Sequence, residues 1–327
     1  MQLSGKNVLI TGGAGFIGSH LVDRVIQENP ANVVVVDNFF LGNEENLENA
    51  RNSYNELKVY RLDASDFASM RTVVEDHHVD VVFNLAVIPL PTSLKYPAWT
   101  IRTISEIALS FCELARTGDI HTLVHCSSSE AYGTAIYVPM DEKHPMNAIT
   151  PYAAGKAAQD SSVQSYIRTF DIDAVIVRPF NNFGPRQNVG SYAGIIPVIV
   201  RKVLSGEPVE IYGDGEQTRD FMFVRDTADA FVRIYEQDIT RGYEINIATG
   251  HEVSVNELVR RLLNVMRVPN YPVIHTDSRP GDVRRHCGDI SLAEKLIGYK
   301  PSLLTDEQLD ETVAWYMRRS ICGSIYL

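Results

Sequence analysis

A tyrosine and a lysine stand four residues apart near the middle of the chain, and together they could move a proton. Thr150 and Pro151 are typical of an N-cap and a first helical position, so Tyr152 and Lys156 would share one face of a helix. A tyrosine with its ordinary pKa of about 10 is a poor base at neutral pH, but a nearby ammonium group favours the phenolate. The pair is consistent with acid–base chemistry, although the same spacing also occurs in helices without a catalytic role.

A serine-rich segment that ends in a carboxylate could complete such a site. Serines occupy positions 127–129 and Glu130 follows them, directly after the apolar run 122–126. If that run is a strand of a parallel sheet, its carboxyl end opens onto the crevice where ligands bind. A hydroxyl there could bond both a substrate and Tyr152, and Glu130 would offer a second acid or base. The alternative is a turn with an incidental carboxylate.

Three glycines near the N-terminus indicate a dinucleotide site. Gly12, Gly15 and Gly18 lie between an apolar run and a helical stretch, where they permit a tight turn and the approach of a pyrophosphate to free N–H groups. Asp37 ends the next apolar run and would accept the ribose hydroxyls of NAD while repelling the 2′-phosphate of NADP. NAD is therefore the predicted cofactor, and a structural turn with a capping aspartate is the alternative.

Two further strand ends carry residues that could contact the same cofactor. Asp63 follows the third apolar run and could bond the adenine amino group, and the segment 84–86 ends the fourth and would border the inner ribose. Either could instead be an ordinary turn. With their neighbours, the predicted cofactor contacts are Gly12, Gly15, Phe16, Ile17, Gly18, Asp37, Asn38, Asp63, Ala64, Leu85, Ala86, Tyr152 and Lys156.

The elements that must position these residues alternate through the first half of the chain. Nearly continuous valine and isoleucine suits strands that are buried on both faces, as in a parallel sheet covered by helices. The alternation predicts an α/β fold with a Rossmann-type doubly wound parallel sheet. The strand-length runs are 8–11, 33–36, 58–62, 79–85, 122–126 and 174–178, and the helical stretches are 15–28, 66–77, 98–117 and 151–170.

After about residue 180 the pattern changes, and we expect a smaller C-terminal α/β domain that binds the substrate. An apolar helix is predicted at 194–204, and capping boxes at 254–257 and 305–308 open two later helices. A strand at 243–247 could return to the first sheet. We therefore predict two partly interleaved domains, residues 1–180 and 181–327.

Composition excludes several classes of protein. The 327 residues include 30 lysines and arginines against 41 acidic residues, a net charge of −11 that argues against nucleic acid or an anionic membrane as partner. No apolar run approaches the roughly 20 residues of a membrane span, and the N-terminus lacks the apolar core of a secretory signal. The four cysteines are widely spaced, as in a reduced, cytoplasmic protein. The nine histidines form no convincing ligand set, so no metal is predicted.

Taken together, the motifs resemble the extended short-chain dehydrogenase/reductase family. The resemblance covers nearly the whole chain and points to the branch of nucleotide-sugar epimerases, dehydratases and decarboxylases. It implies bound NAD, a nucleotide-diphosphate sugar as substrate, and a homodimer formed through the helices near 98–117 and 151–170. The motifs are TGGAGFIG at 11–18, SSSEAYG at 127–133, YAAGK at 152–156, RPFNNFGPRQN at 178–188, IYGDGEQTRDF at 211–221 and RPGDVRRHCGD at 279–289.

The resemblance also implies roles for single residues. Ser128, Tyr152 and Lys156 would form a catalytic triad in which Tyr152 takes the proton of the sugar 4-hydroxyl while hydride passes from C4 to NAD⁺. Guanidinium groups suit phosphate oxygens, which fits arginines at positions that hold the nucleotide diphosphate. The predicted substrate contacts are Ser128, Ser129, Asn181, Arg219 and Arg279.

Glu130 bears on which reaction follows, because the whole branch shares a 4-keto intermediate. A 4-epimerase needs no further base, whereas a 4,6-dehydratase must remove the C5 proton. Glu130 stands two residues after Ser128, where similar dehydratases carry that base, and the stretch 127–145 looks most like dehydratases acting on UDP-N-acetylglucosamine. The resemblance thus implies 4,6-dehydration of a nucleotide hexose. The alternatives are 4-epimerisation, UDP-glucuronate decarboxylation and a non-catalytic NAD-sensing protein.

Two positions depart from the pattern of the family. Ser129 stands where many dTDP-glucose dehydratases have aspartate. Gly155 replaces the serine that usually precedes the lysine, in a helix interior where glycine costs about 1 kcal/mol relative to alanine.

Overall fold

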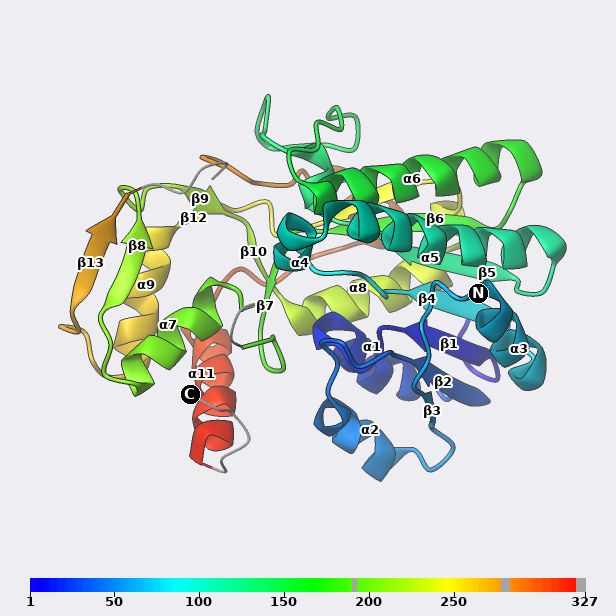
Figure 1. The fold of residues 1–327 in the computed structure, drawn as a ribbon, viewed down its shortest axis with the longest axis horizontal. Coiled ribbons are helices and arrows are strands. Elements are labelled where there is room, and N and C mark those ends of the chain that lie inside the picture. Colours follow the sequence, from blue (N-terminus) through cyan, green and yellow to red (C-terminus); the bar gives the residue numbers. More distant parts are fainter. Residues whose placement is uncertain (190–192, 278–282, 322–327) are drawn as a thin grey trace.

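A parallel sheet of seven strands forms the core of one part of the molecule, on the right in Figure 1. The structure, a computed structural model, describes residues 1–189, 193–277 and 283–321. The strand order is β11–β6–β5–β4–β1–β2–β3, and every neighbouring pair is parallel. The bounds are β1 Asn7–Thr11, β2 Asn32–Val36, β3 Lys58–Tyr60, β4 Val81–Asn84, β5 Thr122–Cys126, β6 Ala174–Pro179 and β11 Glu244–Ile247.

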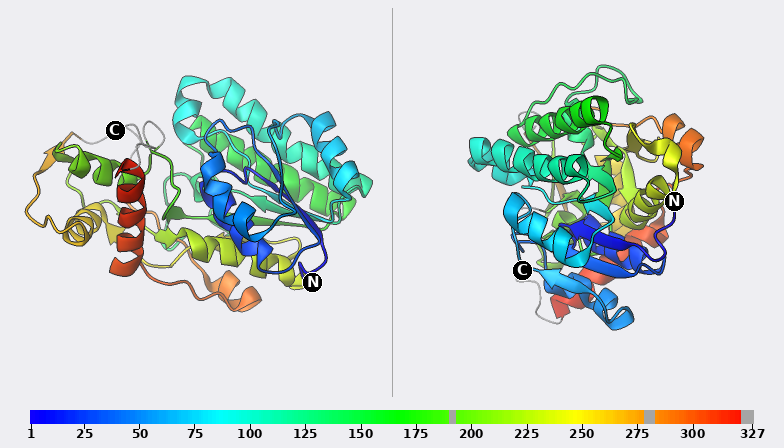
Figure 2. Two further views of the ribbon diagram at one scale, coloured as in Figure 1. Left: turned by 90° about the horizontal axis from the view of Figure 1, so that it is seen from below. Right: turned by 90° about the vertical axis from the view of Figure 1, so that its right-hand side faces the viewer.

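Helices cover both faces of this sheet (Figure 2). Side chains alternate along each strand, so that in β1 Val8 and Ile10 enter one hydrophobic core and Leu9 enters the other. The fold is Rossmann-type and doubly wound, which confirms the predicted fold class. On the first face lie α1 (Phe16–Ile26), η1 (Glu44–Leu47), α2 (Glu48–Ser53), α8 (Val224–Glu236) and α10 (Ser291–Ile297), and on the second lie α3 (Phe67–His77), α5 (Pro97–Thr117) and α6 (Pro151–Phe170).

The glycine in the interior of α6 is explained by the packing of α5 against α6. A Cβ atom on Gly155 would lie 3.1 Å from Cγ2 of Ile104 on α5, closer than an ordinary van der Waals contact. The small residue therefore allows the two helices to approach. The short helix α4 (Leu90–Lys95) precedes α5 and contacts both α5 and α6.

The order of the strands creates a crevice beside β1. The chain passes outward from β1 through β2 and β3, and β4 then returns to the other side of β1. The loops after β1 and β4 consequently lead away from each other at the carboxyl edge of the sheet. In sheets of this kind, ligands bind where the order reverses in this way.

A second group of elements lies beside the sheet and has its own hydrophobic core (Figure 1). The predicted capping box at 305–308 is present, because Gln308 N donates to Thr305 Oγ1 at 3.2 Å and Thr305 N donates to Gln308 Oε1 at 3.1 Å. At 254–257 the N-cap bond is present, from Glu257 N to Ser254 Oγ at 3.1 Å. The strand pairs are β7 (Asn181–Phe183) with β10 (Phe221–Phe223), β8 (Val209–Tyr212) with β13 (Val273–Thr276), and β9 (Thr218–Arg219) with β12 (Val253–Ser254). The helices are α7 (Ile195–Leu204), α9 (Val255–Val265) and α11 (Asp306–Ile321).

Several elements of the second half return to the first core. The strand expected at 243–247 is β11, which pairs with β6 at the edge of the sheet. Helix α8 packs against α1, and α10 contributes Ala293 and Leu296 to the same core. The short helix η4 (Asp238–Thr240) joins α8 to β11. The chain thus crosses between the two parts more than once.

The described residues contain neither a membrane-spanning helix nor a metal-binding group. No helix in them is long and apolar enough to cross a bilayer. No group of three or more histidine, cysteine, aspartate or glutamate side chains in those ranges is placed to hold a metal ion. Cys112, Cys126 and Cys287 are buried free thiols, and Cys322 lies outside the described residues.

Candidate active site

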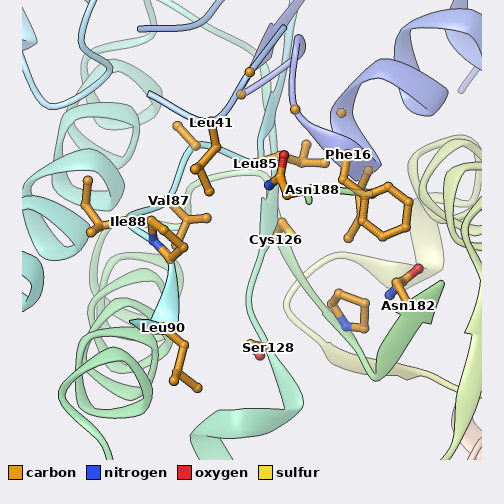
Figure 3. Close-up of a pocket in the computed structure, with 18 of the residues that line it drawn as sticks. Phe16, Leu41, Leu85, Val87, Ile88, Leu90, Cys126, Ser128, Asn182 and Asn188 are labelled. Atoms are coloured by element: carbon orange, nitrogen blue, oxygen red, sulfur yellow. The ribbon is translucent and has the colours of Figure 1, made fainter. Parts of the chain in front are cut away.

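A cleft of about 500 Å³ opens at the carboxyl edge of the sheet, between the sheet and the second group of elements (Figure 3). Its volume is within the range of about 300–1,000 Å³ found for small-molecule sites. Every predicted cofactor contact lines this cleft. Ser128, Glu130 and Asn181 line it as well. The motifs at 11–18, 127–133, 152–156 and 178–188 therefore meet at one place, although they are far apart in the chain.

The turn after β1 can be built only with glycine at two positions. Gly12 has φ +65°, and a Cβ atom on it would lie 3.0 Å from the carbonyl oxygen of Leu85. A Cβ atom on Gly18 would lie 2.1 Å from the carbonyl oxygen of Gly12. The helix α1 begins at Phe16, directly after this turn, so its free N–H groups face the cleft. That arrangement suits a pyrophosphate.

Asp37 connects this turn to the end of β2. Its Oδ2 accepts a hydrogen bond from Ala14 N at 3.0 Å, and its Oδ1 accepts one from Phe39 N at 2.8 Å. Burial raises the pKa of Asp37, and the backbone hydrogen bonds act in the opposite direction. Each oxygen keeps a lone pair for a further donor, and Asp37 lines the cleft, so its carboxylate suits ribose hydroxyls.

A buried polar chain supports the loop after β4. Thr11 Oγ1 donates to Asn84 Oδ1 at 2.7 Å and accepts hydrogen bonds from Leu85 N and Ala86 N at 3.1 and 3.2 Å. Asn84 Nδ2 lies 3.1 Å from Nδ1 of His125. The amide of Asn84 is thus used inside the sheet, and the backbone of Leu85 and Ala86 forms the wall of the cleft.

These features fit NAD on the evidence of the residues themselves. The glycine turn leaves no room for a Cβ atom where a pyrophosphate would approach. An acidic residue stands at the end of β2, and Asp63 and Ala64 line the cleft at the end of β3. The remaining wall is largely apolar, as a nicotinamide or adenine ring requires.

The helix α6 brings Tyr152 and Lys156 to the cleft together. Thr150 caps the helix, because its Oγ1 accepts a hydrogen bond from Ala153 N at 3.1 Å, and the two side chains follow on one face. Lys156 is only 2% exposed, and its Nζ donates to the carbonyl oxygen of Cys126 at 2.8 Å. Burial lowers the pKa of Lys156. The ammonium group is therefore fixed against the end of β5.

Ser128 lies between Tyr152 and Glu130. It caps the short helix η2 (Ser129–Tyr132), because its Oγ accepts a hydrogen bond from Glu130 N at 3.2 Å. Ser128 also forms a hydrogen bond with the side chain of Tyr152. Burial is the largest influence on Tyr152 and raises its pKa, whereas the hydrogen bond with Ser128 lowers it. Serine is thus the neighbour that favours the phenolate.

Glu130 is the carboxylate that follows Ser128 by two residues in the chain. It lines the same cleft as Tyr152 and Ser128. Burial raises the pKa of Glu130, and the positive charge of Arg219 lowers it. A carboxyl group in such surroundings can hold a proton closer to neutral pH than an exposed one, which suits acid–base work.

The predicted substrate contacts are distributed unevenly. Asn181 lines the cleft from β7, and its Nδ2 lies 3.2 Å from Nδ1 of His286. Ser129 is only 4% exposed and is not among the residues that line the cleft. Arg219 donates from Nη1 to the carbonyl oxygens of Thr218 and Val283, at 2.8 and 2.6 Å, and it also stands outside that lining. Arg279 lies outside the described residues.

Several apolar residues of the cleft were not predicted from the sequence. Leu41 follows β2, and Val87, Ile88 and Leu90 follow β4 (Figure 3). One feature of the sequence could have indicated these residues as part of the cleft: they are apolar side chains in segments that follow strands, where polar residues are usual. Phe180 and Ile196 add apolar surface from the other side.

Comparison with known proteins agrees with this geometry. Residues 8–248 match the model of the NAD dependent epimerase/dehydratase family. A UDP-N-acetylglucosamine 4-epimerase from Methanobrevibacter ruminantium, solved in complex with UDP-N-acetylmuramic acid, is 35% identical with a TM-score of 0.89, over 97% of this chain and 99% of that chain. A dTDP-glucose 4,6-dehydratase from Streptomyces venezuelae, solved with NAD bound, is 28% identical with a TM-score of 0.87. The match covers 96% of this chain and 98% of that chain. A UDP-glucuronic acid decarboxylase of Arabidopsis thaliana is 32% identical over 309 residues, which are 92% of this chain and 86% of that protein.

Proposed function

Because the chain belongs to the NAD-dependent epimerase/dehydratase family and is thus an enzyme that uses NAD, we propose that it catalyses the 4,6-dehydration of a nucleotide-diphosphate hexose. The proposed substrate is UDP-N-acetylglucosamine, on the pattern of residues 127–145. In this proposal the sheet holds NAD, and the second group of elements holds the nucleotide sugar.

NAD, when bound, supplies the group that accepts a hydride and later gives it back. The residues proposed to hold it are those that line the cleft from β1 to β4, beginning with the glycine turn and Asp37. The glycine turn binds the pyrophosphate and Asp37 the ribose. Asn181 and Arg219 are proposed to contact the substrate diphosphate, Asn181 directly and Arg219 after a change of its side-chain position.

Tyr152 is the proposed base for the 4-hydroxyl of the sugar. Because burial raises its pKa, the neutral phenol is favoured in the protein alone. Three influences must offset that burial: the hydrogen bond from Ser128, the ammonium group of Lys156, and the positive charge of the oxidised nicotinamide. Removal of the 4-hydroxyl proton then accompanies oxidation at C4.

Glu130 carries the proposal of dehydration. A ketone at C4 acidifies the proton at C5, which the carboxylate of Glu130 removes. The same carboxyl group then gives this proton to the 6-hydroxyl, which leaves as water. The product is complete once C6 has received a hydride and C5 a proton from solvent, to which Tyr152 returns the proton that it took from the 4-hydroxyl. One group can serve in both steps only if it gains and loses a proton readily. The raised pKa of Glu130, caused by its burial in the cleft, fits that requirement.

A second candidate reaction is 4-epimerisation, which is favoured by the 35% identity to the Methanobrevibacter ruminantium epimerase. An epimerase would use Ser128, Tyr152 and Lys156 in the same way and would return the hydride to the other face of C4. It would leave Glu130 without a proton to transfer. Decarboxylation of UDP-glucuronate is the third reaction that the family resemblance offers.

The masses of the products distinguish these reactions. The protein is incubated separately with UDP-N-acetylglucosamine, UDP-glucose and UDP-glucuronate. Loss of water supports dehydration, an unchanged mass with a new retention time would replace it with epimerisation, and loss of carbon dioxide would replace it with decarboxylation. Bound NAD without turnover of any of these sugars would contradict the proposed catalysis.

A homodimer is proposed through α5 and α6, which lie side by side (Figure 1). Large apolar side chains of these two helices are exposed: Trp99 is 43% exposed, Leu109 is 38% exposed and Phe170 is 51% exposed. Burying such residues against a second copy would remove them from water. Leu109→Glu should convert the dimer to a monomer in sedimentation experiments, and a wild-type protein that sediments as a monomer would contradict the proposal.

A further inference from the structure

A buried ion pair lies directly behind the proposed catalytic residues. Asp160 follows Lys156 by about one turn of α6, and Arg178 lies on β6. Their side chains are both 0% exposed, and Arg178 Nη2 is 2.6 Å from Asp160 Oδ2. Taking two charges out of water costs about as much as their attraction returns, so stability alone is a weak reason for such a pair. What the pair contacts is therefore informative.

Asp160 anchors the start of the serine-rich segment. Ser127 Oγ donates to Asp160 Oδ2 at 2.7 Å, while Lys156 Nζ donates to the carbonyl oxygen of Cys126 at 2.8 Å. Two side chains of one helix thus hold two successive residues at the end of β5. Ser128, which bonds Tyr152, comes next in the chain.

Arg178 anchors the end of the same segment. Its Nη1 donates to the hydroxyl of Tyr132 at 2.5 Å, and its guanidinium carbon lies 4.5 Å from the centre of the Tyr132 ring. Tyr132 is the last residue of η2, the helix that carries Glu130. Arg178 Nη2 also donates to Oε2 of Glu244 on β11 at 2.7 Å, and the side chain of Glu244 is 20% exposed. The pair thus fixes residues 127–132 at both ends, with Ser128 and Glu130 between them.

We propose that Asp160 and Arg178 are positioning residues, which hold the segment 127–132 so that Ser128 bonds Tyr152 and Glu130 lines the cleft. The inference rests on the proposed function of that cleft. Neither Asp160 nor Arg178 lines the cleft, so neither touches the substrate in this account.

Asp160 also acts electrostatically on the residues it positions. Its Oδ1 is buried and has no hydrogen-bond partner among the described residues, so its charge is only partly compensated. That charge raises the pKa of both Tyr152 and Lys156. The other titratable groups around this pair are Cys126 and His125 of β5 and Glu130 of η2.

Three variants and one matched control separate positioning from a merely structural role. Ser127→Ala removes one hydrogen bond to Asp160 and leaves the ion pair intact. Asp160→Asn keeps the shape of the side chain and removes its charge, and Asp160→Glu restores the charge. Glu244→Gln is the matched control, because it removes the other carboxylate of Arg178 without touching Ser127.

The variants are compared by kcat, KM, pH profile and thermal midpoint, using whichever nucleotide sugar the wild-type protein converts. Ser127→Ala should lower kcat about tenfold with KM unchanged, since a tenfold change corresponds to the ~1.4 kcal/mol of one hydrogen bond. Asp160→Asn should lower kcat at least as much as Ser127→Ala does. It should also move the acid limb of the pH profile of kcat to lower pH, because the charge that raises the pKa of Tyr152 is removed. Asp160→Glu should return that limb to its wild-type position. Glu244→Gln should lower the thermal midpoint and leave kcat and the limb unchanged.

Hydrogen exchange gives a readout that does not depend on turnover. Ser127→Ala should speed exchange of the amides in 127–132, including Glu130 N, and Glu244→Gln should not do so at the start of that segment. An epimerase product would contradict the proposed dehydration but would leave this comparison valid. The inference is overturned if Ser127→Ala has the same kcat and the same hydrogen exchange as Glu244→Gln. This comparison does not need Asp160→Asn, so it tests the inference even if that variant fails to fold.

Discussion

Replacing Gly18 by alanine should disable the cofactor site, because the new methyl group meets backbone. The added Cβ atom would lie 2.1 Å from the carbonyl oxygen of Gly12 and 2.8 Å from its carbonyl carbon. A carbon and an oxygen approach no closer than about 3.3 Å even in favourable contacts, so the turn must open by roughly 1 Å. Such overpacking costs about 1–3 kcal/mol of folding free energy. It also moves the N–H groups that would face the pyrophosphate.

The affinity for NAD should then fall at least tenfold. A hydrogen bond to a charged group contributes about 1.5–3 kcal/mol, so losing one weakens binding by roughly 10- to 150-fold. Isothermal titration with NAD measures this directly. Gly118→Ala is the control: Gly118 has φ +80° with nothing within 4 Å of its Cβ position, so alanine there strains the backbone far from the cleft. Wild-type affinity in Gly18→Ala, or an equal loss in Gly118→Ala, would refute the reasoning.

Two further changes test Tyr152 in the cleft and the buried His125 of β5. Tyr152→Phe should bind NAD within about twofold of wild type and slow hydride transfer by roughly 10²–10⁴, measured in a single turnover, and a rate near that of wild type would disprove its role as base. His125 is fully buried with a pKa lowered to about 3, so its charged form is excluded from the folded state and stability is lost as pH falls below 6.5. The stability advantage of wild type over His125→Gln in urea unfolding should therefore shrink by about 1.4 kcal/mol for each pH unit between 6.5 and the folded-state pKa of about 3, and a constant difference would contradict the burial argument.

Much of the sheet could be predicted because its signals are local. Runs of valine and isoleucine predicted the central strands, and β2 (Asn32–Val36) begins one residue before the predicted 33–36. Capping residues predicted the start of α6 at Pro151. Helix α8 (Val224–Glu236) was missed, although its buried Val224, Ala228, Phe231 and Tyr235 recur at helical spacing. The pairing of β8 with β13 joins segments about 60 residues apart, and no local pattern indicates it.

The site shows the same division between local and distant information. The glycine turn, the Tyr152–Lys156 pair and Glu130 could be predicted because each depends on a short segment. The direction of a side chain depends on its neighbours in space: Asn84 turns to Thr11 and His125, and Ser129, the first residue of η2, is buried. The position of Arg219 depends on the carbonyl oxygen of Val283, which is 64 residues away in the chain.

Turnover of UDP-N-acetylglucosamine in deuterium oxide tests the central claim, the role of Glu130, most directly. If Glu130 removes the C5 proton before water leaves, the wild-type product should have lost one water and gained one deuterium at C5. Glu130→Gln should still oxidise C4, because Ser128, Tyr152 and Lys156 are intact, but it should release little dehydrated product. A wild-type product of unchanged mass, or full dehydration by Glu130→Gln, would contradict the account.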